Sequence, residues 1–515
     1  MTNQTIADVP ESRGLQRAFK FFAVIERVGN LLPNPFWLFW ILSVVLAVLS
    51  ALLAASGVST MNPATGKGVA VQSMLTAEGL QMVLGTAVSN FATFPPMATI
   101  ITVLLGIAVA EKSGLIDTLL HGMVTRVPPK YLTFALAMAG MVGHVAGDAA
   151  YVTLIPLGAL VFLAAGRSPL IGIVVAYVSI AAGYDASPSL TTTDVLLSGL
   201  TTAAAQTIDH SYIVTPVANY YFGVSSSVII ALAITIVTEK VLVRRPDLQV
   251  DDDIDLESHT DLGRLESTPA ASRAMRATGL AALIFAAVLV LGMIPASSPL
   301  RGEGGGIVNS VVFSGMAFVL CLFFTMLGVV YGFVSGSFTK PSQIVEAMVG
   351  GVRSLAPILV LFFAIAQFLA YFKWTKIGEV MAITGAEWLA AMNVPGWTIL
   401  LGIAILITFM NFVITSGSAL WALAAPVFVP MLMLLDIPPE TTQAVYRIAD
   451  SVTNSVTPMS PYFVMALGFM QQYRKSAGIG TLASFTIPIA IVVWTVWIGF
   501  FMAWYFANVP FGPGY

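Results

Sequence analysis

The chain has 515 residues, of which 57% are hydrophobic and only 10% are charged, with a formal net charge of −3. A soluble domain carries roughly 25% charged residues, so no soluble core could absorb this much apolar surface. In a membrane only helices and closed barrels satisfy their backbone groups, and the long apolar runs exclude a barrel. The composition therefore predicts an all-α polytopic membrane protein.

Nine transmembrane helices and two re-entrant hairpins account for the apolar segments in chain order. The hairpins, 131–166 and 396–435, each have two arms that are shorter than the roughly 20 residues a full span needs. The nine spans are expected near 36–55, 94–111, 169–204, 218–239, 277–295, 309–334, 355–372, 440–472 and 480–507. The third and eighth spans carry prolines and polar residues at their centres, which predicts two broken helices.

The basic residues indicate how the chain is oriented. Cytoplasmic loops are enriched in Lys and Arg, and most of the 23 basic residues fall on one side if the N-terminus is cytoplasmic. Treating the first hairpin as one full crossing would move Arg167 to the outside and invert every later span. The charge bias therefore favours a re-entrant hairpin, a cytoplasmic N-terminus and an outer C-terminus.

Two halves follow from this order of elements. Residues 1–243 hold spans one to four and the first hairpin, and residues 277–515 hold spans five to nine and the second hairpin. The segment 244–276 between them is rich in Asp and Glu and is typical of a solvated cytoplasmic linker. Each half contains a span, a hairpin, a broken span and a span, in opposite orientations. Inverted repeats of this kind build a transport site near the midplane.

The two breaks contain the residues that are most costly in lipid. The first holds Asp185 and Asp194, and the second holds Arg447, Asp450 and Pro458. A charged side chain at the bilayer centre costs roughly 2.5–3.5 kcal/mol on insertion scales, so these residues are candidates for function. Arg447 and Asp450 are three positions apart, so they could instead form a structural ion pair on one helix face.

The hairpin tips supply further oxygen atoms. Asn411, Asp450 and nearby carbonyl groups predict a site for a hard monovalent cation such as sodium. In the first half, Asp148 with Asp185 is the candidate for a second ion site. His144 either titrates near neutral pH or serves only as a hydrogen-bonding residue.

A short motif is repeated at the two tips. Ser418 and Trp421 are three residues apart, as are Asp148 and Tyr151, and a proline follows five residues later in both. Trp421 is either a stacking surface for an aromatic substrate or a packing residue.

Three segments together resemble the AbgT family of p-aminobenzoyl-glutamate transporters. They are Arg447-Ile-Ala-Asp450-Ser-Val-Thr-Asn with Thr457-Pro-Met, Ser418-Ala-Leu-Trp421 leading into Ala425-Pro-Val-Phe-Val-Pro-Met, and Gly106-Ile-Ala-Val-Ala-Glu-Lys-Ser-Gly. The resemblance covers nearly the whole chain. It implies a homodimer in the bacterial inner membrane, with nine helices and two hairpins per subunit. The family's functional residues match Asp194, Ser418, Trp421, Arg447, Asp450 and Pro458, and its sodium site matches Asn411 and Asp450.

The resulting prediction is a secondary transporter and not an enzyme. The chain has no Walker loop, so an ion gradient or the substrate's own gradient would drive transport. An ion-driven carrier would use sodium or a proton as coupling ion and no other cofactor. The resemblance implies p-aminobenzoyl-glutamate-like folate fragments, sulfonamide antimetabolites, or both as substrates, in either direction. Arg447 could bind a carboxylate through two parallel hydrogen bonds. The alternatives are a sodium-coupled dicarboxylate symporter, an ion channel and a membrane hydrolase; no nucleic-acid partner is expected.

Overall fold

The computed structural model describes residues 33–61, 68–125, 127–246, 248–251, 268–302, 305–306 and 310–514. These residues are almost entirely helical, as the sequence predicts. Their one sheet is a two-stranded antiparallel ribbon, β1 (Ser59–Met61) with β2 (Gly68–Ala70). The N-terminal residues 1–32 and the acidic run 252–267 of the expected linker lie outside the described residues.

Seven apolar helical segments of the described chain are long enough to cross a membrane. They are α2 (Pro35–Ala55), α3 (Ala77–Ala92) with α4 (Pro95–Lys112), α10 (Tyr220–Lys240), α12 (Pro269–Met293), α14 (Met316–Ser335), α16 (Ala356–Trp374) and α22 (Ile479–Phe506). Four short helical elements are also present: η1 (Pro129–Tyr131), η2 (His144–Ala146), η3 (Leu242–Arg244) and α13 (Val311–Ser314).

Both hairpins have the predicted form. The first consists of α6 (Leu132–Gly143) and α7 (Ala149–Ala164), and the second of α18 (Gly396–Asn411) and α19 (Gly417–Met433). Neither arm of either hairpin reaches the length of a full span.

Both predicted breaks are present as well. Span three divides into α8 (Pro169–Ala182) and α9 (Thr192–Ala205), and span eight into α20 (Pro439–Asn454) and α21 (Pro461–Gln471). Each helix after a break has a local start signal. Helix α9 begins with a capping box between Thr191 and Asp194, and α21 begins with a proline in its first turn.

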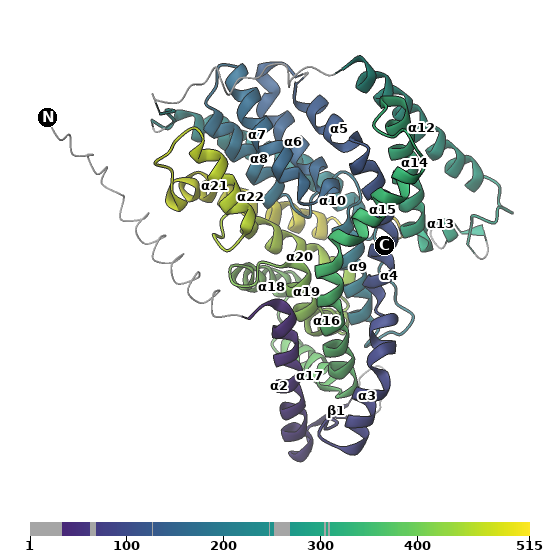
Figure 1. The fold of residues 1–515 in the computed structure, drawn as a ribbon. Coiled ribbons are helices and arrows are strands. Elements are labelled where there is room, and N and C mark those ends of the chain that lie inside the picture. The colour runs from purple at the N-terminus through teal and green to yellow at the C-terminus, as the bar shows by residue number, and fades with distance from the viewer. Residues whose placement is uncertain are drawn as a thin grey trace, which may run out of the picture.

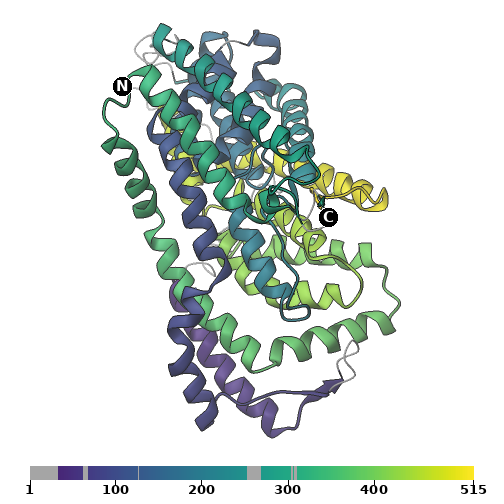
Figure 2. The same cartoon turned by 90° about the vertical axis from the view of Figure 1, so that its right-hand side faces the viewer.

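The broken helices lie at the centre of the molecule. In Figure 1, α2, α3, α17 (Ile377–Ala391) and the small sheet gather at one end, and α6, α7 and α12 lie toward the other. Helices α9 and α20 lie between them (Figure 1) and pack against each other and against α19. Figure 2 shows the long α4 running beside α14 along one side. This arrangement brings the tips of both hairpins and both breaks to the middle of the molecule.

Some helices are missing from the sequence prediction or are placed differently. Helices α3, α5 (Leu115–Thr125), α15 (Ser342–Ser354) and α17 are additional to the nine predicted spans. Helix α15 is short and amphipathic, and α3 mixes polar with apolar residues. Neither sequence therefore has the continuous apolar run that predicts a membrane span. Helix α12 begins at Pro269, eight residues before the expected span and within the segment predicted as the linker. The Thr268 side chain caps this earlier start.

Candidate functional site

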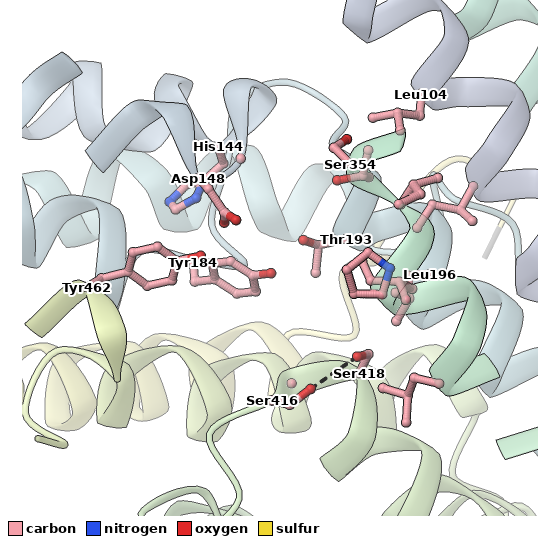
Figure 3. Close-up of a pocket in the computed structure, with 18 of the residues that line it drawn as sticks. Leu104, His144, Asp148, Tyr184, Thr193, Leu196, Ser354, Ser416, Ser418 and Tyr462 are labelled. Carbon is pink, nitrogen blue, oxygen red and sulfur yellow. Dashed lines mark hydrogen bonds between the residues drawn. The ribbon is translucent and has the colours of Figure 1, made fainter. Parts of the chain in front are cut away.

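A cavity of about 780 Å³ lies between the two hairpin tips. One side is formed by residues 144–149 of the first tip and the other by residues 415–418 of the second. The first break adds Tyr184 and Thr193, and the second adds Asn454, Ser460 and Tyr462. Helices α2, α4 and α16 supply much of the rest of the wall. Figure 3 shows the two tips facing each other across this space. The predicted meeting of hairpin tips and helix breaks is thus present as one cavity.

The second tip rests on Asp450. The Tyr446 hydroxyl donates a hydrogen bond of 2.5 Å to the Gly417 carbonyl oxygen, which ties the tip to α20. A Cβ atom on Gly417 would lie 2.8 Å from Asp450 Oδ2, closer than real Cβ contacts allow. Glycine is therefore required at 417 for close approach to the carboxylate.

Asn411 and Asp450 are adjacent, and the oxygens they present suit a hard cation. Asn411 Nδ2 donates to the Asp450 carbonyl oxygen at 2.5 Å, to Asn454 Oδ1 at 3.2 Å and to the Thr453 hydroxyl. Asn411 Oδ1 and Asp450 Oδ1 are buried and have no hydrogen-bond partner in the described part of the chain. Buried polar atoms without partners are rare, and hard cations prefer oxygen ligands, one of them charged. These two residues therefore fit the expected sodium site.

Arg447 joins the two halves. Its Nη1 lies 2.7 Å from Asp194 Oδ1 and 4.0 Å from Asp185 Oδ1, and all three side chains are largely buried. The second Asp194 oxygen accepts bonds from the Thr191 backbone N–H at 2.7 Å and hydroxyl at 2.8 Å. The alternative of an Arg447–Asp450 pair is wrong, because the ion pairs that Arg447 makes with described residues are to the first half.

Trp421 lies behind the cavity wall. Its side chain has no solvent exposure, its ring packs on Tyr446 with centroids 4.3 Å apart, and its Nε1 donates to the Thr201 hydroxyl at 2.9 Å. Thr201 also donates to Gln443 at 2.6 Å. In this conformation Trp421 holds the second hairpin against α9 and α20.

Three of the predicted site residues line the cavity, namely Asp148, Ser418 and Asp450. The others lie behind its wall: Asn411, Asp185, Asp194, Trp421, Arg447 and Pro458. Asp148 and Asp185 have different surroundings, since Asp148 faces the cavity and Asp185 lies beside Arg447. A shared second ion site therefore stays a prediction.

The sequence prediction overlooked the aromatic wall. Tyr184 and Tyr462 line the cavity, and Tyr462 stacks on Tyr151 with centroids 4.0 Å apart and rings 5° from parallel. Tyr184 and Tyr462 lie at the ends of the polar breaks, a position that could have drawn attention to them. The lining also includes Glu111 of α4, which was not among the predicted site residues.

Among the described residues, the cavity lining holds three acids and no lysine or arginine. The acids are Glu111, Asp148 and Asp450, from α4, the first tip and α20. A cavity with this lining attracts cations and repels an anion until its charge is reduced.

Comparisons with known proteins agree with this architecture. Residues 20–515 match the AbgT putative transporter family. The p-aminobenzoyl-glutamate transport protein of Escherichia coli (strain K12) is 33% identical over 512 residues, which cover 99% of each chain.

Two solved structures are similar over nearly the whole chain. The YdaH transporter of Alcanivorax borkumensis is 37% identical, with a TM-score of 0.87 over 93% of this chain and 100% of that one. MtrF of Neisseria gonorrhoeae, described with a class of antimetabolite efflux pumps, is 37% identical, with a TM-score of 0.90 over 94% and 97%. The chain therefore belongs to the AbgT family of membrane transporters, which confirms the resemblance drawn from its motifs.

Proposed function

We propose that the chain is an ion-gradient-driven secondary transporter of p-aminobenzoyl-glutamate-like folate fragments, sulfonamide antimetabolites, or both. The observation that carries the proposal is the single cavity to which both hairpin tips and both helix breaks contribute. Its volume of about 780 Å³ lies within the roughly 300–1,000 Å³ of sites that hold small organic ligands. The relatives named for p-aminobenzoyl-glutamate transport and for antimetabolite efflux support this choice of substrates.

The charge of the cavity supports ion coupling. p-Aminobenzoyl-glutamate carries two carboxylates, and the described lining offers acids without a compensating lysine or arginine. A cation held by Asn411 and Asp450 would remove one negative charge beside the second tip. Sodium or a proton bound there would therefore raise the affinity for the anionic substrate, which is the requirement for cotransport.

The predicted residues then fall into two groups. Ser418 contacts substrate directly, and Asp450 with Asn411 binds the coupling ion. Asp194, Trp421 and Pro458 position the hairpin and the breaks from behind the wall. Arg447 is bonded to Asp194 and does not line the cavity, so its role as a carboxylate clamp requires that this pair opens or shifts during transport.

Assembly and orientation follow the sequence prediction. We propose a homodimer in the bacterial inner membrane, with the N-terminus in the cytoplasm and the C-terminus outside.

Transport by the purified full chain in proteoliposomes tests the proposal. Counterflow of labelled p-aminobenzoyl-glutamate and of sulfamethazine would be measured with sodium and pH gradients imposed separately. Uptake that follows one of the gradients supports the proposal and identifies the coupling ion. Failure to move either compound under any gradient would contradict it, and a conductance far above carrier turnover would indicate a channel.

A further inference from the structure

The tip of the first hairpin carries a buried nitrogen that the proposed function does not use. His144 lines the cavity and is 5% exposed.

His144 Nε2 is buried and has no hydrogen-bond partner within the described ranges. A neutral imidazole has one donor nitrogen and one acceptor nitrogen. This end of the cavity thus holds an imidazole whose hydrogen-bonding capacity the described protein does not use up.

Aromatic rings and a carboxylate surround this nitrogen. The Tyr184 ring meets the His144 ring edge to face, with centroids 5.6 Å apart. Tyr462 stacks on Tyr151, with ring centroids 4.0 Å apart, and lines the same end of the cavity as Asp148. Figure 3 shows His144, Asp148, Tyr184 and Tyr462 on one side of the cavity. Flat rings beside two acceptors form a surface for an aromatic group that carries hydrogen-bond donors.

The opposite end of the cavity has the reverse character. Ser416 and Ser418 lie across the space in Figure 3, with their hydroxyls 3.3 Å apart. Helix α19 begins there at Gly417, so its N-terminus adds partial positive charge. Hydroxyl donors, a helix N-terminus and a cation at Asp450 suit an anionic group, whereas Asp148 at the first tip repels one.

We propose that the first-hairpin tip is an aromatic-amine subsite. The His144 imidazole and Asp148 accept the N–H hydrogens of a para-amino group, and the rings of Tyr184 and Tyr462 flank its aromatic ring. The carboxylates of p-aminobenzoyl-glutamate then point toward the second tip. This inference rests on the proposed function and adds the orientation of the substrate. It also identifies the group that folate fragments and sulfonamides share as the one recognised.

A pair of ligands that differ only in the amino group tests the subsite. Competition by p-aminobenzoyl-glutamate and by benzoyl-glutamate would be measured on the purified full chain against labelled p-aminobenzoyl-glutamate at saturating sodium. Wild type is expected to prefer the amine about tenfold, as one or two hydrogen bonds allow. The preference should fall to about twofold in His144→Leu. Asp148→Ala, at an exposed position that should tolerate substitution, should also narrow the preference.

Two control variants separate the subsite from general damage. Ser418→Ala should weaken both ligands equally and keep their ratio, and His210→Leu, at an exposed loop position, should change neither. An unchanged ratio in both His144→Leu and Asp148→Ala would overturn the proposal, as would loss of the preference in Ser418→Ala alone. Equal binding of both ligands by wild type would refute the subsite but leave the proposed function standing. Binding of neither ligand would refute both.

Discussion

The two hairpins have the same architecture, but their tips differ in chemistry. The first tip presents a carboxylate and an imidazole, Asp148 and His144, and turns at Gly147 with a φ of +55°. The second presents hydroxyls, turns without a positive φ and rests on Asp450 through Gly417. The two breaks differ as well: the first contains Asp185 and Asp194, and α20 before the second contains Arg447. Repetition thus supplies a central cavity, and divergence between the repeats gives it two unlike ends.

The largest expected effect lies at the second tip. Asp450→Ala should abolish sodium-coupled uptake, because it removes the one charged ligand of the proposed cation site. Loss of a direct ligand should lower sodium affinity by more than the 10–100-fold typical of outer-shell changes, and Asn411→Ala should be milder. Sodium-dependent uptake in vesicles, with folding and assembly state compared with wild type by size exclusion, measures this. Asp148→Ala is the matched change at the first tip and should keep sodium-dependent uptake. If Asp148→Ala loses sodium dependence and Asp450→Ala keeps it, the ion site lies in the first half.

The next effect concerns the ion pair that links the halves. Arg447→Ala leaves Asp185 and Asp194 buried without their counter-charge, which should lower the free energy of unfolding by about 3–5 kcal/mol. Thermal denaturation in detergent measures the loss.

Arg447→Lys separates the positioning role from the clamp. Lysine keeps the charge but not the planar fork that binds a carboxylate through two bonds. If Arg447 clamps the substrate, Arg447→Lys should transport sulfonamides better than p-aminobenzoyl-glutamate, relative to wild type, in the same vesicles. If Arg447→Lys instead transports both substrates as well as wild type does, Arg447 acts only as the structural ion-pair partner of the first half.

The second helix break and the ion pair of Arg447 beside it show what the sequence could and could not predict. The interruptions of spans three and eight are local features, since prolines and polar residues within apolar runs stand out. The hairpins were predictable for the same reason. The partner of Arg447 was not, because Asp194 lies in the other half of the chain and only packing of α9 on α20 brings them together.

The residues that line the cavity were also only partly predictable from the sequence. Three candidates line it, but Trp421 turned out to lie behind it, since a sequence does not show which side of a helix faces a neighbour.

A smaller effect distinguishes the glycines of the two tips. Gly147→Ala forces a side chain into a positive-φ conformation and should cost about 1–3 kcal/mol in stability. Gly417→Ala should act mainly on sodium affinity, because its Cβ would meet Asp450 Oδ2 at 2.8 Å. Thermal shifts with and without sodium measure both quantities. Gly402→Ala, in α18 with no atom within 4 Å of the added Cβ, is the control and should be neutral or stabilising. Equal losses of sodium-induced stabilisation in both tip variants would contradict the distinction.

The smallest effect compares the two aromatic residues of the repeated motif. Trp421 is fixed by a hydrogen bond to Thr201 as well as by packing on Tyr446, whereas Tyr151 is fixed by stacking on Tyr462. Trp421→Phe keeps a ring against Tyr446 but deletes the indole N–H, so it should cost about 1 kcal/mol. Tyr151→Phe keeps its stack and should stay within about 0.5 kcal/mol of wild type.

A double-mutant cycle sharpens the comparison. If the bond to Thr201 carries the loss, Thr201→Val and Trp421→Phe should be non-additive in thermal denaturation. The same variants bear on the stacking hypothesis, because a ring that positions the hairpin should affect sodium and substrate affinity together. Loss of aromatic-substrate affinity alone in Trp421→Phe, with additive stabilities, would instead mean that this ring becomes accessible and contacts the substrate during the transport cycle.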